Sequence, residues 1–148
     1  TMGITLYEWL QQLYVKYGFF REGLVNVVRK GKDGAAEIQQ MMVDYRQTPP
    51  QSLLGSPVVK ILDYKTLEEL DVVSGERKPI EGIDEKSNVL QWLTADGTKV
   101  SVRPSGTEPK IKFYFGVKMP LQRVEDFEAV EAQLDAKIEE LKRELNLV

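Results

Sequence analysis

The sequence predicts an α+β domain in which one antiparallel sheet of about four to five strands carries two helices on one face. Three observations lead to this prediction. Asp96-Gly97 lies between two apolar stretches, which is a strong hairpin signal. Residues 111–117 alternate between apolar and polar side chains, as a half-buried strand does. Residues 124–145 carry apolar side chains at helical spacing. With short connections, the order β-α-β-β-β-β-α fits two layers.

The chain begins with an additional helix, predicted over residues 5–17. Thr5 and Glu8 have the spacing of a capping box, in which each residue satisfies a free backbone donor of the helix start. Apolar side chains then recur at helical intervals up to Tyr17. This helix is expected to be separate from the two that cover the sheet.

A strand and a helix are expected next. Residues 24–29 are rich in valine, which is typical of a strand. Asp33 suits the N-cap of a helix that ends near Arg46, and Pro49-Pro50 prevents its continuation. The apolar side chains expected on its inner face are Ile38, Met41, Met42 and Tyr45.

A further strand is predicted over residues 58–64, whereas residues 65–87 are expected to have little regular structure. The second segment is polar and acidic, and it contains Gly75, Pro79 and Gly82, which interrupt regular elements. Its carboxylates lack the spacing of an EF-hand loop. A solvated excursion is therefore favoured over a cation site.

Three strands follow before the last helix. Residues 89–94 and 98–103 are predicted to pair across the hairpin turn, and the strand over 111–117 is expected to return beside them. Because successive side chains of a strand point to opposite faces, the alternation places Arg103 and Lys112 on polar faces of their strands.

The composition excludes several kinds of function. The 148-residue chain has no cysteine, so disulfides, thiolate zinc sites and cysteine nucleophiles are excluded. It also has no histidine, which is the commonest general base and metal ligand. The net charge of −3 argues against a nucleic-acid partner. No apolar run approaches the ~20 residues of a membrane span, so no membrane partner is expected.

The residues best suited to chemistry form one loop, Arg103-Pro-Ser-Gly-Thr-Glu-Pro109. Arg103 supplies a planar cationic fork that matches phosphate, and Ser105 and Thr107 supply hydroxyl donors. Gly106 lets the backbone approach an anion closely and adopt a positive φ, so that successive N–H groups can converge on the anion. Because the loop precedes a strand, no helix dipole is expected to assist it. From these residues alone, an ordinary solvated loop is an equal alternative.

Residues 101–117, SVRPSGTEPKIKFYFGV, closely resemble the C-terminal phosphate-binding signature of the α-D-phosphohexomutase family, which includes phosphoglucomutases and phosphomannomutases. Residues 6–22, 47–50 and 87–110 are also similar to bacterial phosphoglucomutase-type members. The resemblance therefore covers nearly the whole chain, and it is strongest over residues 87–117.

The resemblance implies a TBP-like fold and a place at the end of a four-domain cytoplasmic isomerase of carbohydrate metabolism that interconverts sugar 1-phosphates and 6-phosphates. Residues 1–20 would then be a helix from the end of the preceding domain or a linker, and residues 21–148 the C-terminal phosphate-binding domain. Family enzymes use a phosphoserine, Mg²⁺ and a sugar bisphosphate, and their catalytic, metal and sugar loops have no counterpart in this sequence. The expected partners are therefore a phosphosugar and the three preceding domains, and the chain alone is expected to be inactive.

By position, the resemblance assigns Arg103, Ser105, Gly106 and Thr107 to the grip on the phosphate that is not being transferred. Lys112 stands where some relatives place a second cationic contact. Catalytic residues and metal ligands are not expected in this chain. Two other functions stay open from the sequence: a stand-alone module that binds a phosphorylated metabolite, and a protein-interaction module.

Overall fold

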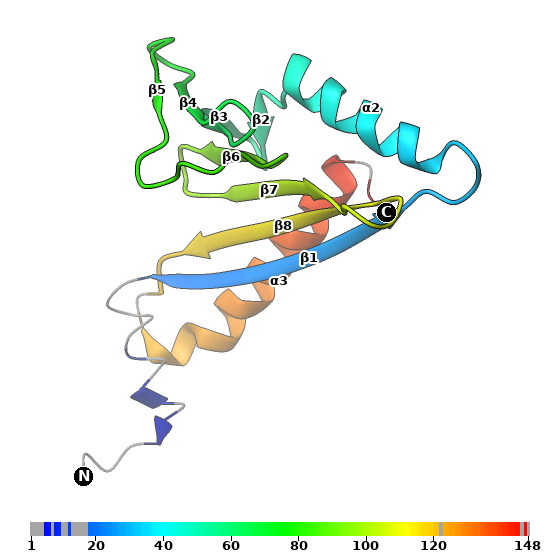
Figure 1. Ribbon diagram of the computed structural model, residues 1–148. Helices are drawn as coiled ribbons and strands as arrows, with labels where there is room; N and C mark the ends of the chain where they lie inside the picture. Colours follow the sequence, from blue (N-terminus) through cyan, green and yellow to red (C-terminus); the bar gives the residue numbers. More distant parts are fainter. Residues whose placement is uncertain are drawn as a thin grey trace.

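The computed structural model describes residues 5, 6, 8, 9, 12, 18–121, 123–145 and 147. Its strands form one antiparallel sheet in the order β1-β8-β7-β6-β3-β4-β5, with the short β2 paired to β3 (Figure 1). The elements are β1 (Phe19–Val28), α2 (Gly34–Gln47), β2 (Ser52–Leu53), β3 (Ser56–Asp63), β4 (Glu68–Asp71), β5 (Arg77–Pro79), β6 (Leu90–Thr94), β7 (Lys99–Pro104), β8 (Lys110–Met119), the 3₁₀ turn η1 (Val124–Asp126) and α3 (Phe127–Glu144).

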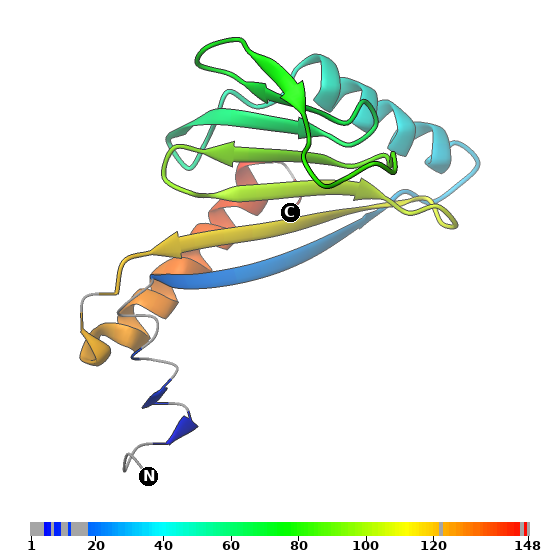
Figure 2. The same cartoon turned by 60° about the vertical axis from the view of Figure 1, so that its left-hand side comes forward.

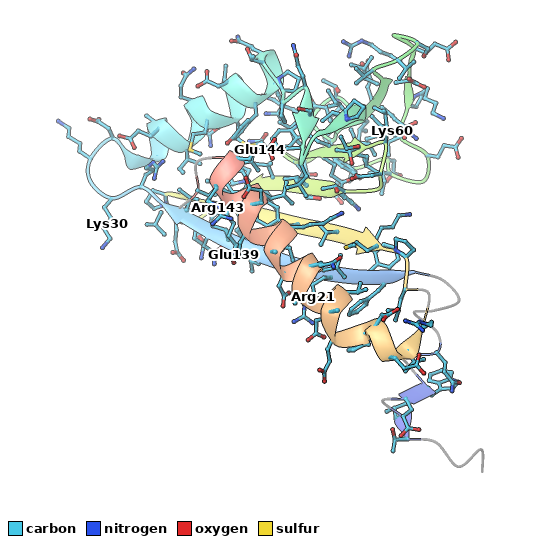
Figure 3. The ribbon with its side chains drawn as sticks, turned by 180° about the vertical axis from the view of Figure 1, so that it is seen from behind. Arg21, Lys30, Lys60, Glu139, Arg143 and Glu144 are labelled. Carbon is cyan, nitrogen blue, oxygen red and sulfur yellow. The ribbon has the colours of Figure 1, made fainter. Side chains whose placement is uncertain are left out.

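Both helices pack on one face of the sheet and form one core with it, as the sequence predicts. The side of the sheet that carries α3 is turned to the viewer in Figure 3. The Tyr45 ring of α2 meets the rings of Trp92 and Phe113 edge-on, at centroid distances of 5.1 and 6.0 Å. On β1, Gly23 lets α3 approach closely, because a Cβ there would lie 2.8 Å from Cγ2 of Ile138. Burial of these apolar groups supplies the main driving force for folding.

The alternation predicted for β7 and β8 is confirmed. Val100 and Val102 of β7 are fully buried, and so is every second residue of β8 from Ile111 to Val117. The Asp96-Gly97 hairpin is confirmed as well, since the Thr94 N–H donates to the Thr98 carbonyl at 2.9 Å. These three central strands carry the core-facing residues that order the domain.

The described residues form a sheet of eight strands instead of four to five, and the expectation for residues 65–87 is wrong. Two of the extra strands, β4 and β5, lie within this segment and pair with each other antiparallel. Their turn is closed by the Asp71 side chain, which accepts hydrogen bonds from the Val73 and Ser74 N–H groups at 3.0 and 3.1 Å. Both strands are short and polar, and main-chain pairing holds them without an apolar alternation that a sequence could reveal.

β1 begins at Phe19, five residues before the predicted strand start. The Phe19 ring stacks on Phe127 at 4.7 Å, and Arg21 forms an ion pair of 2.8 Å with Asp135 of α3. These contacts hold the start of β1 against the first half of α3. The valine-rich run begins only at Leu24, and the polar residues Arg21 and Glu22 with Gly23 separate Phe19 and Phe20 from it, so the pattern does not join the two parts into one strand.

The described residues of the predicted N-terminal helix, Leu6, Glu8, Trp9 and Gln12, are helical. The Glu8 N–H donates to the Thr5 hydroxyl oxygen at 3.1 Å, as one half of a capping box requires. The rest of the segment, including Tyr17, lies outside the described residues, and the domain boundary at residue 20 stays a prediction. None of the described helices combines the length and the apolar character needed to cross a bilayer.

Candidate functional site

The candidate site is the loop between β7 and β8, which leaves the sheet at the same end as the connection from β1 to α2 (Figures 1 and 2). Pro104 ends β7 and Lys110 begins β8. The Ser105 N–H donates to the Lys110 carbonyl at 2.9 Å and thereby closes the base of the loop. The two strands therefore present the short segment 105–109 as a defined turn.

Ser105 organises the interior of this loop. Its hydroxyl oxygen accepts hydrogen bonds from the N–H groups of Thr107 and Glu108, each at 3.3 Å. Its Oγ also lies 3.5 Å from that of Thr107. Two backbone donors and two hydroxyls are thus gathered at one point, which is the donor set that an anion needs.

Gly106 differs from the expectation of a positive φ. Its φ lies outside the left-handed region, whereas six other glycines of the described chain adopt positive values. The space around it is open, since a Cβ at Gly106 would meet no atom within 4 Å. Gly106 therefore leaves room for a ligand close to the backbone, and it is not needed for the turn geometry.

Arg103 and Lys112 lie opposite each other on β7 and β8, and Asn26 of β1 is the next residue in the same row. In the part of the chain that the structure describes, neither cation makes a salt bridge. The nearby Lys110 ammonium lies 3.8 Å from the Glu108 carboxylate. Two cations at the end of the sheet are thus available for an anionic ligand.

A cavity of about 300 Å³ separates the loop from the start of α2. It brings together three of the five predicted site residues, Ser105, Gly106 and Thr107, but not Arg103 or Lys112. Its full lining is Gly31, Lys32, Ala35, Ile38 and Gln39 on one side and Ser105, Gly106, Thr107, Glu108 and Pro109 on the other. Lys32 and Gln39 were not singled out from the sequence. They lie more than 60 residues before the loop, and no local pattern reveals that they line the same cavity as the loop.

The start of α2 packs against the loop. The expectation that no helix dipole assists the loop is therefore wrong. The Arg29 N–H donates to the Pro109 carbonyl at 2.9 Å. A Cβ at Gly34, the first residue of α2, would lie 3.2 Å from Cβ of Pro109. Because β1 pairs with β8, the helix that follows β1 begins beside the loop that precedes β8. The positive end of the α2 dipole therefore lies at this cavity.

Tyr45 lies near the C-terminal end of α2, where its ring packs into the core. Burial raises the pKa of the Tyr45 phenol above its ordinary value, and the positive charge of Arg29 offsets part of this rise. The phenol is therefore neutral at physiological pH and serves packing. Among the described residues, no cluster of three or more carboxylates is placed to hold a metal ion.

A family model and several relatives match the sequence of this chain. The family model "Phosphoglucomutase/phosphomannomutase, C-terminal domain" matches residues 24–134. A phosphoglucomutase of Staphylococcus aureus (strain MRSA252) is 35% identical over 136 residues, and one of Staphylococcus saprophyticus is 31% identical over 134 residues. These alignments cover 92% and 90% of this chain but only 23% of each relative. A solved structure, the open form of the Paramecium phosphoglucomutase parafusin, has a TM-score of 0.48 and 16% identity over 97% of this chain and 24% of that chain.

Proposed function

The chain belongs to the family of phosphoglucomutase/phosphomannomutase C-terminal domains, and on this premise we propose that it binds the phosphate of a phosphosugar within an enzyme that interconverts sugar 1-phosphates and 6-phosphates. The observation that carries the proposal is the loop 105–109, which gathers backbone N–H groups and two hydroxyls beside a 300 Å³ cavity. The relatives are named phosphoglucomutases, and this chain spans 23% of their length.

The donors of the loop suit a phosphate monoester. The bonds from Thr107 and Glu108 to the Ser105 oxygen are long, at 3.3 Å, so a phosphate oxygen can replace the serine as their acceptor. Hydrogen bonds to an anion are shorter and about twice as strong as neutral ones. Arg103 and Lys112 add positive charge from the end of the sheet.

In this proposal, the chain holds the phosphate that is not being transferred. A site that recognises phosphate through N–H groups, hydroxyls and cations does not require one orientation of the sugar. The substrate can therefore bind in either of two orientations. The binding energy of this remote group then helps to position the reacting end. Closure of the domain over the substrate would also exclude water from the transfer.

The remaining chemistry lies outside this chain in our proposal. The phosphoserine, the Mg²⁺ and the sugar bisphosphate of such an enzyme would be held by three further domains of a cytoplasmic polypeptide. The described residues offer no carboxylate cluster that fits the metal. We accordingly expect the chain to bind phosphosugars but not to isomerise them.

The direct test is an NMR titration of the chain with glucose 6-phosphate, with unphosphorylated glucose as the control. A single phosphate on a half-exposed loop is expected to bind with a Kd on the order of 1 mM, or about −4 kcal/mol. Chemical shifts should change around residues 103–112, and Arg103→Ala should abolish them. If saturating glucose 6-phosphate leaves these residues unshifted, the proposed function is wrong. Self-association without any response to phosphate would favour a protein-interaction module instead.

A further inference from the structure

We infer that Lys32 is a further contact of the bound phosphate, reaching it from the wall of the cavity opposite the loop. The inference rests on the proposed function and adds a residue to the same site. Lys32 lies in the connection between β1 and α2, and it lines the cavity together with Ser105, Gly106 and Thr107. The ligand is therefore enclosed between two segments far apart in the sequence.

The position of Lys32 relative to the loop is fixed by the backbone. The connection is tied to the loop by the hydrogen bond from Arg29 to Pro109 at 2.9 Å, and it turns at Gly31, whose φ is +97°. The Gly34 N–H then donates to the Gly31 carbonyl at 3.3 Å. Because both walls of the cavity are anchored to paired strands, the backbone at Lys32 is held at the cavity before any ligand binds, and little backbone ordering is needed on binding.

The charges on the walls favour an anion. Within the described part of the chain, Lys32 has no carboxylate partner. The acidic lining residue, Glu108, is 64% exposed at its side chain, and its carboxylate lies 3.8 Å from the Lys110 ammonium. An unpaired lysine that lines one cavity together with two hydroxyl side chains is a suitable arrangement for a phosphate monoester.

The size of the cavity indicates how much of the ligand it can hold. Its volume of about 300 Å³ lies at the lower end of the range of roughly 300–1,000 Å³ for small-molecule sites. This space exceeds what one phosphate group fills, so part of the sugar would follow the phosphate into the cavity. The Gln39 amide, which lines the same wall as Lys32, is available to the sugar hydroxyls.

The test compares two lysines of one connection. Lys32→Ala should weaken glucose 6-phosphate binding by about 3- to 10-fold, as expected for the loss of one partly exposed charge contact. Lys30→Ala is the matched control: Lys30 carries the same charge, is exposed and does not line the cavity, and it projects outward at the edge of the molecule (Figure 3). It should change the Kd by less than about twofold. Lys32→Arg should retain most of the affinity.

The outcomes separate this inference from the proposed function. If Lys32→Ala and Lys30→Ala have the same small effect while Arg103→Ala abolishes binding, Lys32 is not a phosphate contact and the proposed function stands. If both alanine variants weaken binding equally, the effect is one of general charge and the inference is overturned. If the unaltered chain shows no binding at millimolar glucose 6-phosphate, both proposals fail. Two-dimensional amide spectra of each variant confirm that it is folded.

Discussion

Ser105 is the side chain on which the shape of the loop depends, because its oxygen accepts both internal N–H groups, those of Thr107 and Glu108. We expect Ser105→Ala to remove one hydroxyl donor to the phosphate together with the acceptor that orders the loop before binding, and so to weaken glucose 6-phosphate binding roughly fivefold, or about 1 kcal/mol. The Kd from NMR titration measures this effect. Ser101→Ala, on the preceding strand, should leave the Kd unchanged. An unaltered Kd for Ser105→Ala would mean that the Ser105 hydroxyl neither shapes the loop nor contacts the phosphate.

Gly34 permits the close contact between the start of α2 and its surroundings. A Cβ at this position would lie 2.1 Å from the Arg29 carbonyl oxygen, which is a backbone atom and cannot move aside freely. We expect Gly34→Ala to lower the free energy of unfolding by about 2–3 kcal/mol, measured by urea denaturation. Binding of glucose 6-phosphate should weaken as well, because the connection that carries Lys32 is displaced.

Gly106→Ala is the matched control for this substitution. Its surroundings are open and its φ is not left-handed, so its free energy of unfolding should stay within about 0.5 kcal/mol of the parent value. If Gly34→Ala is as stable as Gly106→Ala, the described contact between Gly34 and the Arg29 carbonyl is contradicted.

Hydrogen bonds around the Asp96 side chain stabilise the β6–β7 hairpin. Burial alone would raise the pKa of the Asp96 carboxyl, but hydrogen bonds from Thr94 and Thr98 outweigh it, and the pKa lies below its ordinary value of 3.8. A lowered pKa in the folded state adds stability that is present above pH ~4 and is lost as the pH falls through the folded-state pKa.

We therefore expect Asp96→Asn to reduce stability at pH 7 and to have a smaller effect at pH 3. Urea denaturation of both proteins at the two pH values tests this expectation. A difference in stability that is equal at both pH values would show that the charge of Asp96 does not contribute. Glu85→Gln, in the exposed segment before β6, is the control for loss of one negative charge.

The elements that could be predicted from the sequence are those with local signals. Asp96-Gly97 specifies a turn, and the alternation along β8 specifies a buried face, so β6, β7 and β8 were predicted within a few residues. β4 and β5 have only four and three residues and carry charged side chains. Their pairing depends on β3, which supplies the neighbouring edge, and no pattern within residues 65–87 reveals that edge.

The candidate site also combines residues that could be predicted from the sequence with residues that could not. Ser105, Gly106 and Thr107 could be predicted because the chemistry and the resemblance of the loop are contained in consecutive residues. Lys32 could not, because it reaches the cavity only through the pairing of β1 with β8 and the start of α2 beside the loop. A contact of this kind depends on the register of distant strands, which local periodicity does not determine.

The groups that we propose to bind the phosphate lie at one end of the sheet. The β7–β8 loop and the β1–α2 connection both emerge there, with Arg103 and Lys112 on the adjoining strand ends (Figure 2). One face of the sheet is covered by α2 and α3, and this packing fixes the strands that carry the loop. The central claim is that this end of the domain binds the phosphate of a phosphosugar.

A crystal structure of the chain with bound glucose 6-phosphate tests this claim most directly. The account predicts a phosphate in the cavity between the loop and α2, within hydrogen-bond distance of the Ser105 and Thr107 hydroxyls and of the Lys32 ammonium. A phosphosugar bound elsewhere on the domain, with the cavity filled only by solvent at saturating ligand, would contradict it.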